Sequence, residues 1–416
     1  MLSKRPEMFL PEQWPSYYSK AKGVEVWDLD GNEYVDMSNC GVGACVLGFA
    51  DLDVDEAVRN AIQSGSMATL NCPEEVELAD LLCELHPWAD MVRYARGGGE
   101  AIAVAVRIAR AKTRRDKIAF CGYHGWHDWY LSANLSDGGA LDGHLLPGLE
   151  PAGVPRGLTG TAFPFSYNRL DELKAIVATH KNELAAIVME PVRNDEPEES
   201  FLKTIREIAT ANGSVLIFDE VTSGWRLNVG GAHLLYRVTP DMAVFAKAMS
   251  NGYPMAAIIG VGDVMEAAQN SFISSTYWTE RIGPVAALAT IRKVKRCDVP
   301  KHLNEVGRRI QSGWCAAGDC AGLSISISGI PPLSHFSFNY PNDLEIQTLF
   351  TQLMLDRGFL ATNVFYATYA HKENHVEGYL KAVEEIFRVI ARAVEKGEVG
   401  RRLNGPAAHS GFRRLA

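Results

Sequence analysis

The 416-residue chain contains no long apolar run and no regular cysteine pattern. Nowhere do about twenty apolar residues follow one another, so no membrane-spanning helix is predicted. The eight cysteines are irregularly spaced, with neither a CxxC pair nor a cysteine/histidine cluster of zinc spacing. This pattern argues against a metal site and favours reduced thiols in a cytoplasmic protein. The N-terminal segment is interrupted by prolines and lacks a continuous apolar core, so we expect no signal peptide.

The chain also lacks any long block of like charge. Its net charge of -9 is spread along the sequence, which gives no reason to expect a nucleic-acid partner. Hydrophobic residues make up 47% of the chain and charged residues 22%, as in an ordinary globular protein. The length exceeds what one small core requires, so we expect a large domain and a smaller one.

The order of patterns along the chain predicts an α/β fold. Apolar segments without polar alternation take turns with helical segments between residues 97 and 260, which is typical of a parallel sheet covered on both faces. We expect a large domain at residues 55–295 and a smaller α+β domain built from residues 1–54 and 296–416. The first of these small-domain segments should contain a hairpin that turns at Asp30-Gly31-Asn32.

Two of the apolar segments run directly into charged residues. The segment "SVLIF" leads to Asp219, and "MAVFA" leads to Lys247. Ligands of parallel sheets gather at the carboxyl ends of the strands, so both residues are candidates for a site. A buried ion pair between the two side chains would explain the same pattern.

Two further segments carry features that favour a site. Gly97, Gly98 and Gly99 precede a strongly helical segment, where exposed N–H groups can bind phosphate. The segment "YHGWHDWY" follows another strand and supplies rings that could cover a flat cofactor. A phosphate cup, a flat ring, a carboxylate and a lysine together meet the needs of pyridoxal phosphate. The apolar residues before Lys247 would also favour the neutral amine that this chemistry uses.

Several motifs in order resemble those of the class III (fold type I) aminotransferases, in the branch near glutamate-1-semialdehyde aminomutase. The motifs are "VWDLDGNEYVDMS", "GGGEA", "YHG", "FDEVTSGWRLNVGGAH", "FAKAMSNGYPMAAIIG" and "STYWTERIGPVAALA". The resemblance covers nearly the whole chain. It implies a large domain that binds pyridoxal phosphate on a mostly parallel central sheet, together with a smaller α+β domain.

The resemblance also implies roles for individual residues. Lys247 matches the lysine that forms the Schiff base and moves protons, and Asp219 matches the partner of the pyridine nitrogen. Val221 would pack on one face of the ring, and Tyr123 would cover the other. Gly98–Gly99 matches the phosphate-binding position, where the usual hydroxyl residue is absent, so backbone N–H groups would carry more of that contact.

The resemblance further implies a homodimer with active sites shared across the interface. Thr276 matches a threonine that reaches the phosphate from the neighbouring subunit. The segment after Thr276 is about three residues longer than usual, so Thr279 competes for this role. Asp195 stands where related ω-aminotransferases carry a glutamate, and the N-terminal segment lacks the arginine typical of the aminomutases.

Other residues are candidates for lesser roles. Five residues could line a substrate pocket. They are Ser38, Asn39, Trp225, Arg226 and Glu190, the last of which ends an apolar segment. Glu100 in the first turn of a helix is better explained by the helix dipole. His124 and His127 could belong to the site beside Tyr123, but no ligand-spaced partner accompanies them, so we expect no metal.

The leading hypothesis is a transaminase that works by ping-pong chemistry. It would move an amino group from a donor such as glutamate to an aldehyde or ketone, with a sugar or polyol phosphate among the candidate acceptors. The alternatives are an intramolecular aminomutase, an epimerase dependent on the same cofactor, and a structural protein that kept the fold without the chemistry.

Overall fold

The computed structural model describes residues 4–144, 147–409 and 411. The chain forms two compact units. The large unit comprises the described residues of Glu56–Val192, Glu196–Lys293 and Gly411–Ala416. The small unit comprises the described residues of Met1–Asp55, Arg193–Asp195 and Val294–Ser410. Each unit has its own sheets and helices.

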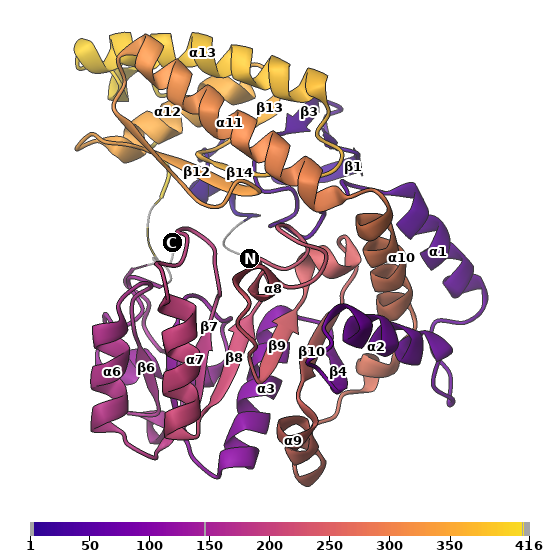
Figure 1. Cartoon of the computed structure of the whole chain (residues 1–416). Helices are drawn as coiled ribbons and strands as arrows, with labels where there is room; N and C mark the ends of the chain where they lie inside the picture. Colours follow the sequence, from indigo (N-terminus) through magenta and orange to yellow (C-terminus); the bar gives the residue numbers. More distant parts are fainter. Residues whose placement is uncertain (1–3, 145–146, 410, 412–416) are drawn as a thin grey trace. The chain divides into compact units, whose positions relative to one another are not determined.

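A seven-stranded sheet forms the centre of the large unit (Figure 1). Its strand order is β4-β10-β9-β8-β7-β5-β6. The five strands from β9 to β6 pair in parallel, whereas β10 is antiparallel to both of its neighbours. The strands are β4 (Met91–Ala95), β5 (Lys117–Cys121), β6 (Ala162–Pro164), β7 (Leu184–Met189), β8 (Val215–Asp219), β9 (Met242–Phe245) and β10 (Ala256–Gly260). The predicted α/β class with a mostly parallel sheet is therefore confirmed.

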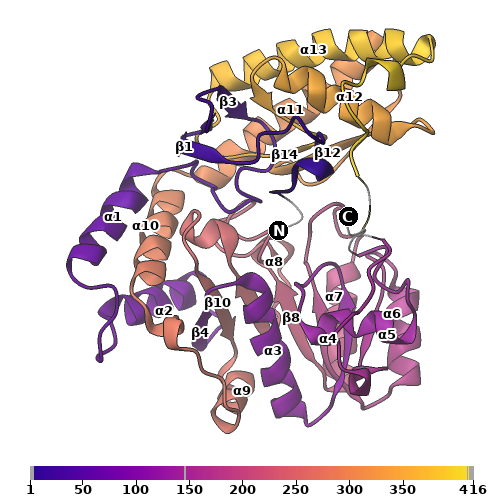
Figure 2. The same cartoon turned by 180° about the vertical axis from the view of Figure 1, so that it is seen from behind.

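Helices cover both faces of this sheet. Every residue of β7, β8 and β9 is buried, which explains why these strands read as continuous apolar runs. Alternate strand residues pack on α3 (Gly98–Thr113) on one face and on α6 (Leu170–Thr179) and α7 (Phe201–Asn212) on the other. Figures 1 and 2 show these two faces in turn.

Shorter elements complete the large unit. Helix α2 (Pro73–Leu85) begins at a proline, a residue that is favoured at the first position of a helix. Helices α1 (Leu52–Gln63) and α10 (Ile282–Arg296) contribute residues to both units. The other short helices are α4 (Asp128–Leu131), α5 (Ala133–Ser136), α8 (His233–Tyr236), α9 (Gly262–Met265), η3 (Arg156–Leu158), η4 (Lys247–Ser250), η5 (Glu266–Asn270) and η6 (Thr276–Thr279).

The small unit combines the two ends of the chain in one sheet. The hairpin of β2 (Glu25–Asp28) and β3 (Glu33–Asp36) turns through Gly31 at φ +87°, as predicted. Strand β1 (Tyr18–Lys22) extends it on one side, and β13 (Phe359–Leu360) pairs in parallel with β3 on the other. The N-terminal hairpin therefore belongs to the same sheet as a C-terminal strand.

A second sheet and three long helices form the rest of the small unit. This sheet has the order β11-β12-β14, from strands Ile325–Ser328, Leu333–Phe338 and Val364–Tyr366. The helices are α11 (Val299–Ala321), α12 (Asp343–Leu355) and α13 (Glu373–Glu395), and two 3-10 turns, η2 (Pro6–Met8) and η7 (Gly400–Arg402), lie near the ends of the described chain. Helix α13 buries an apolar stripe with helical spacing, and Trp314 of α11 donates a hydrogen bond to the hydroxyl of Tyr379 at 2.9 Å.

Candidate active site

Three charged side chains gather at the carboxyl edge of the parallel strands. Glu190 follows β7, Asp219 is the last residue of β8, and Lys247 lies two residues after β9. Because these strands are adjacent and parallel, their carboxyl ends meet at one edge of the sheet. Open α/β sheets bind ligands at this edge.

Asp219 is 4% exposed, and both of its carboxylate oxygens are held. Oδ1 accepts a hydrogen bond from the N–H of Val221 at 3.0 Å, and Oδ2 lies 2.8 Å from Nδ1 of His124. The other ring nitrogen of the buried His124 donates to the carbonyl oxygen of Cys121 at 3.0 Å. Since a carbonyl oxygen only accepts, that nitrogen carries a hydrogen, and the bond between Nδ1 and Oδ2 needs a second proton. The pair of Asp219 and His124 is therefore neutral as a whole.

Lys247 begins η4 with a φ of +47°, in the left-handed region that residues other than glycine seldom adopt. Its half-buried ammonium donates a hydrogen bond to Oγ1 of Thr222 at 2.9 Å. Among the residues that the structure describes, Asp219 pairs with His124 at 2.8 Å. The strained backbone fixes the direction in which the lysine leaves the strand.

The glycine segment packs against the turns that follow β8 and β9. A Cβ atom on Gly98 would lie 2.8 Å from Cγ1 of Val221 and 3.5 Å from the Cβ of Ala246. A Cβ atom on Gly99 would lie 3.3 Å from the Cα of Gly125. Three segments that are distant in sequence therefore meet at the N-terminus of α3, and side chains at the two glycines would close the gap between them.

The first turn of α3 offers hydrogen-bond donors. N–H groups in the first turn of a helix have no partner within the helix. Glu100 caps two preceding groups, the N–H of Arg96 at 2.9 Å and that of Gly97 at 3.3 Å, which agrees with the helix-terminus role expected for it. Nδ1 of His127 is buried near Gly99, and no hydrogen-bond partner for it exists among the described residues. Burial lowers the pKa of His127.

Tyr123 and Glu190 flank the turn after β5. Tyr123 is 38% exposed, and its ring packs edge-on against Tyr130 with the centroids 5.9 Å apart. Gly122 has a φ of +106°, and a Cβ atom there would lie 2.9 Å from Oε2 of Glu190. Tyr123 is thus exposed beside His124, and its role against a cofactor ring stays a prediction.

A buried hydrogen-bond network around Glu220 lies next to Asp219. It was not predicted from the sequence. Glu220 is fully buried, and Oε1 accepts from the N–H and from Nδ1 of His233, both at 2.9 Å. Oε2 accepts from the hydroxyl of Ser223, and Nε2 of His233 accepts from Nε1 of Trp88 at 3.0 Å. Burial raises the pKa of Glu220, but the hydrogen bonds from His233 and Ser223 outweigh it and hold the pKa below its ordinary value. The two consecutive carboxylates at the end of "SVLIFDE" could have indicated it, because a second charged residue directly after a buried strand needs partners of its own.

The two candidate threonines of the phosphate site lie at the ends of η6. Both Thr276 and Thr279 are exposed, and the hydroxyl of Thr279 donates to the carbonyl oxygen of Thr276 at 3.2 Å. Arg96 donates to the carbonyl oxygens of Trp278 at 3.0 Å and Glu280 at 2.9 Å. This contact ties η6 to the residue that precedes the glycine segment.

Trp225 and Arg226 lie in the turn after β8, where each is 1% exposed. Trp225, with a φ of +67°, packs against His86 and Phe245 at centroid distances of 6.3 and 5.6 Å. Nε of Arg226 donates to the carbonyl oxygen of Thr222 at 2.8 Å. These contacts make the turn rigid, and the predicted substrate contacts of both residues stay predictions.

The remaining candidates belong to the small unit. The N–H and the hydroxyl of the buried Ser38 both donate to Oδ1 of Asp36 at 2.9 Å. The side-chain oxygen of Asn39 accepts from the N–H of Val42 at 3.0 Å. Asp195 lines a cavity of this unit. Substrate contacts by Ser38 and Asn39 stay predictions.

Two observations concern other kinds of site. Within the described parts of the chain, no group of three His, Cys, Asp or Glu side chains is arranged to hold a metal ion. In the same residues, no helix has the length and apolar character needed to cross a membrane.

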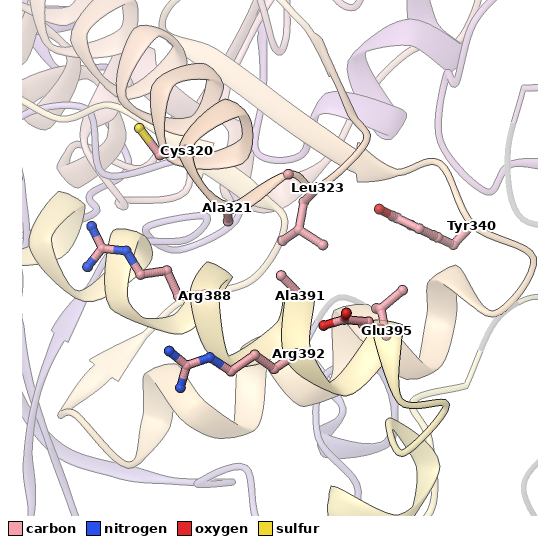
Figure 3. A pocket seen from close by; sticks show the side chains of 10 residues that line it. Cys320, Ala321, Leu323, Tyr340, Arg388, Ala391, Arg392 and Glu395 are labelled. Carbon is pink, nitrogen blue, oxygen red and sulfur yellow. The ribbon is translucent and has the colours of Figure 1, made fainter.

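Open cavities occur among the described residues of the small unit. One has a volume of about 490 Å³ and lies where the end of α11 meets the last turns of α13 (Figure 3). Another has a volume of about 510 Å³ and is lined by Arg193, Asn194, Asp195, Ser328, His335, Val364 and Tyr366.

The residues at the sheet edge fit pyridoxal phosphate. The first turn of α3 and the unpartnered Nδ1 of His127 supply donors suited to a phosphate. The absence of a side chain at Gly98 lets the N-terminus of α3 approach Val221 closely. A carboxylate such as that of Asp219 and an amine such as that of Lys247 are the groups that the ring nitrogen and the aldehyde of this cofactor require.

Comparison with known proteins identifies the family. The class-III aminotransferase family model matches residues 11–319. The chain is 32% identical to 3-aminobutyryl-CoA aminotransferase of Cloacimonas acidaminovorans, over 92% of this chain and 91% of that protein. It is 31% identical to glutamate-1-semialdehyde 2,1-aminomutase of Desulforamulus reducens, over 91% of each.

Solved structures agree on the fold. An ω-transaminase from Sphaerobacter thermophilus superposes with a TM-score of 0.83 at 26% identity, covering 93% of this chain and 94% of that one. The FumI protein of Sphingopyxis sp. MTA144, solved with pyridoxal phosphate, reaches a TM-score of 0.85 at 22% identity, covering 94% and 92%. The chain belongs to the class-III aminotransferases, enzymes that depend on pyridoxal phosphate.

Proposed function

We propose that this enzyme transfers an amino group from a donor such as glutamate to an aldehyde or ketone in two half-reactions. In the first, the donor amine becomes a carbonyl and leaves its amino group on the enzyme. In the second, the acceptor carbonyl takes up that amino group. The two halves balance without any external oxidant or reductant. When bound, pyridoxal phosphate supplies the electron sink that both halves require.

With the cofactor bound, Lys247 would hold it covalently and would then move a proton at the substrate carbon. The observation that carries the proposal is its position at the carboxyl edge beside Asp219, on a backbone fixed at φ +47°. Thr222 receives the lysine hydrogen bond at 2.9 Å and orients the amine before the cofactor binds. A proton acceptor must lie within hydrogen-bond reach of the reacting carbon, and a fixed backbone direction favours that.

Asp219 and His124 together hold the cofactor ring nitrogen in its protonated form. Nδ1 of His124 and Oδ2 of Asp219 lie 2.8 Å apart, and both residues are buried. A charge-assisted hydrogen bond in a buried site is stronger than one in water. His124 touches Asp219 and not the reacting atoms, so it is a positioning residue.

Five further residues complete the cofactor site. Gly98 and Gly99 bring the N-terminus of α3 close to the phosphate, with His127 as a neutral donor. Val221 packs on one face of the ring and Tyr123 on the other. The contact between Val221 and the glycine segment supports this arrangement.

We also propose a homodimer in which Thr276 or Thr279 reaches the phosphate of the partner subunit. Exposed aromatic side chains flank these threonines, with Phe272 at 90% and Tyr277 at 70% exposure. Large exposed apolar side chains that cluster in one segment favour a protein interface. The anchoring of the same segment by Arg96 supports a fixed position for the threonines.

The relatives support an acceptor carbonyl that is not adjacent to a carboxylate. The name 3-aminobutyryl-CoA places the amino group on the third carbon of the acyl chain. The second relative acts on a semialdehyde. A ketone or aldehyde that carries its polar group further along the chain is therefore the acceptor that we favour.

The substitution Lys247→Ala tests the proposal. We expect it to abolish the visible absorbance that arises when the wild-type protein binds pyridoxal phosphate, and to lower turnover by about 10²- to 10⁴-fold. Lys203→Ala on the exposed side of α7 is the matched control and should behave like the wild type. Sustained turnover by the Lys247 variant would exclude the assigned role.

The second candidate is an intramolecular aminomutase, favoured by the 31% identity to the Desulforamulus enzyme. Adding glutamate without any acceptor discriminates between the transaminase and the aminomutase. A transaminase converts the bound cofactor to its aminated form when glutamate is added, which bleaches the visible band. An aminomutase or an epimerase leaves the band unchanged under the same conditions.

A further inference from the structure

Both backbone polar groups of Gly122, the residue after β5, are held by side chains. Its carbonyl oxygen accepts a hydrogen bond from the hydroxyl of Tyr130 at 3.1 Å, and its N–H donates to Nδ1 of His144 at 3.3 Å. Gly122 has a φ of +106°, which favours glycine, and Oε2 of Glu190 lies where a side chain would begin. Side chains from two other segments therefore fix the turn at this glycine.

The turn carries two residues of the candidate cofactor site. Tyr123 and His124 follow Gly122 directly, and His124 pairs with Asp219 at 2.8 Å. The ring of Tyr123 is exposed and packs edge-on against Tyr130 with the centroids 5.9 Å apart. The hydrogen bonds at Gly122 thus fix the backbone from which the exposed Tyr123 ring extends.

His144 lies on a segment that is itself anchored. Oδ1 of the buried Asn134 accepts from the N–H of Leu141 at 2.9 Å, and its Nδ2 donates to the carbonyl oxygen of Leu149 at 2.8 Å. Both leucines are buried, and the N–H of His144 donates to the carbonyl oxygen of Leu141 at 2.9 Å. The imidazole packs edge-on against Phe120 of β5 with the centroids 5.8 Å apart. These contacts hold His144 in place independently of its bond to the turn.

The hydrogen bond at Gly122 determines the tautomer of His144. A backbone N–H only donates, so Nδ1 presents its lone pair and the neutral ring carries its hydrogen on Nε2. Burial lowers the pKa of His144, the nearby His124 lowers it further, and Glu172 of α6 raises it. Glu190 also lies beside this turn. The ring is thus neutral near pH 7, the state in which it accepts the bond.

We propose that His144 is a positioning residue of the cofactor site, whose Nδ1 fixes the turn at Gly122 and thereby the ring of Tyr123. This inference rests on the proposed function, in which Tyr123 covers one face of the cofactor ring. His144 acts through the turn and not on the reacting atoms. A purely structural role would involve the same contacts and leave the affinity for the cofactor unchanged.

Two substitutions separate the acceptor atom of His144 from its bulk. His144→Phe keeps a flat ring beside Phe120 and removes the acceptor, whereas His144→Asn places an amide oxygen close to the position of Nδ1. Titration of the cofactor-free protein with pyridoxal phosphate measures the affinity without turnover. We expect the affinity to fall about 10-fold in His144→Phe and to stay within about 2-fold of the wild type in His144→Asn. An equal loss in both variants overturns the proposal.

His180→Phe is the matched control. His180 is also half-buried, and its ring packs on Phe163 with the centroids 4.2 Å apart. Its Nδ1 accepts from Nζ of Lys117, the first residue of β5, at 3.1 Å. The control therefore loses a similar bond at the opposite end of the same strand, and its cofactor affinity should match that of the wild type. Equal losses in the two phenylalanine variants would indicate a general loosening of β5 and overturn the proposal.

A double-mutant cycle with Tyr123→Leu tests whether His144 acts through Tyr123. Without the tyrosine ring, His144→Phe should lower the affinity by less than about 3-fold, because the group that it positions is gone. A full 10-fold loss in that background, about the same as in the wild type, overturns the proposal. If Tyr123→Leu alone leaves the affinity unchanged, the proposed role of Tyr123 itself is wrong, which distinguishes the two failures.

Acid provides a test that does not depend on the folding of His144→Phe. As the pH falls below the ordinary histidine pKa of about 6.5 and through the lower folded value of His144, Nδ1 takes a proton and no longer accepts from Gly122. The wild type should therefore lose cofactor affinity on acidification more steeply than His144→Asn, whose amide does not titrate. Parallel pH profiles of the two proteins would overturn the assignment.

Discussion

Asp219 and Glu220 are neighbours in sequence, and each pairs with the Nδ1 atom of a buried histidine. The distances are nearly equal, 2.8 Å from Asp219 to His124 and 2.9 Å from Glu220 to His233. The pairs differ in the hydrogen bond made by the other ring nitrogen of the histidine, Nε2, here called the far nitrogen. That of His124 donates to a carbonyl oxygen, whereas that of His233 accepts from Nε1 of Trp88.

This difference sets the charge of each pair. The carbonyl oxygen beside His124 obliges its far nitrogen to carry a hydrogen, so the pair with Asp219 holds an extra proton and is neutral. The indole N–H beside His233 obliges the far nitrogen to accept, so that ring is neutral and the Glu220 pair keeps one negative charge. Three donors from His233 and Ser223 satisfy that charge. We infer that the first pair serves the cofactor and the second holds the turn in place.

The surroundings of His233 reinforce the structural role. His86 stacks on its ring with centroids 5.6 Å apart, donates from Nδ1 to the carbonyl of Leu82, and accepts from the N–H of Gly231. Burial lowers the pKa of His86 to about 4. His86 therefore stays neutral near pH 7 and adds no charge to the network.

The largest expected effect comes from Glu220→Gln, which breaks the second pair without touching the first. An amide cannot accept all three hydrogen bonds, and it presents a donor to groups that themselves donate. We expect the free energy of unfolding to fall by about 3–5 kcal/mol in a denaturant titration. Glu199→Gln, at an exposed position, should change it little. If Glu220→Gln unfolded with the same free energy as the wild type, Glu220 would have no structural role.

The free energy of unfolding of Glu220→Gln should depend less on pH in the acidic range than that of the wild type. The pKa of Glu220 is lowered in the fold, so its contribution to stability is full above the ordinary glutamate pKa of about 4.3 and is lost as the pH falls from there through the folded value. The stability gap between the wild type and Glu220→Gln should therefore narrow on acidification.

Much of this architecture was predictable from the sequence. Continuous apolar runs such as "MAVFA" identified the buried parallel strands, because strands covered on both faces have no polar side. The same logic identified Asp219 and Lys247, because a charge at the end of such a run lies at the carboxyl edge. The turn at Gly31 followed from its local chemistry.

The contacts between distant segments were not predictable. His124 and Asp219 are separated by 95 positions, and Trp88 and His233 by 145, so no local pattern links them. Their partners depend on how the strands are ordered in the sheet. The cavity of about 510 Å³ in the small unit likewise joins residues 193–195 with β11, β12 and β14, a neighbourhood that sequence spacing does not reveal.

A smaller effect is expected from His124→Asn, which alters the first pair. The asparagine amide can still donate to Asp219, but the bond to the carbonyl of Cys121 and the extra proton are lost. We expect the affinity for pyridoxal phosphate to fall by about 10- to 100-fold, because a hydrogen bond to a charged group is weakened. The pH dependence of the cofactor absorbance should shift as well, which a purely structural role would not produce.

His233→Asn is the matched control for that experiment. It should lower thermal stability while leaving the cofactor absorbance and its pH dependence as in the wild type. If the two asparagine variants lost cofactor affinity and stability to the same degree, the two pairs would be equivalent and the assignment of separate roles would fail.

The smallest effect is expected from Trp88→Phe, which removes the donor that keeps His233 neutral. Losing one hydrogen bond in a partly buried site should lower the free energy of unfolding by about 1 kcal/mol. The far nitrogen of His233 is then able to take a proton, so the Glu220 pair acquires the neutral state of the Asp219 pair. Nitrogen NMR of the histidine rings should show a hydrogen on Nε2 of His233 in the variant alone. An unchanged His233 spectrum would mean that Glu220, and not the indole, determines which nitrogen carries the hydrogen.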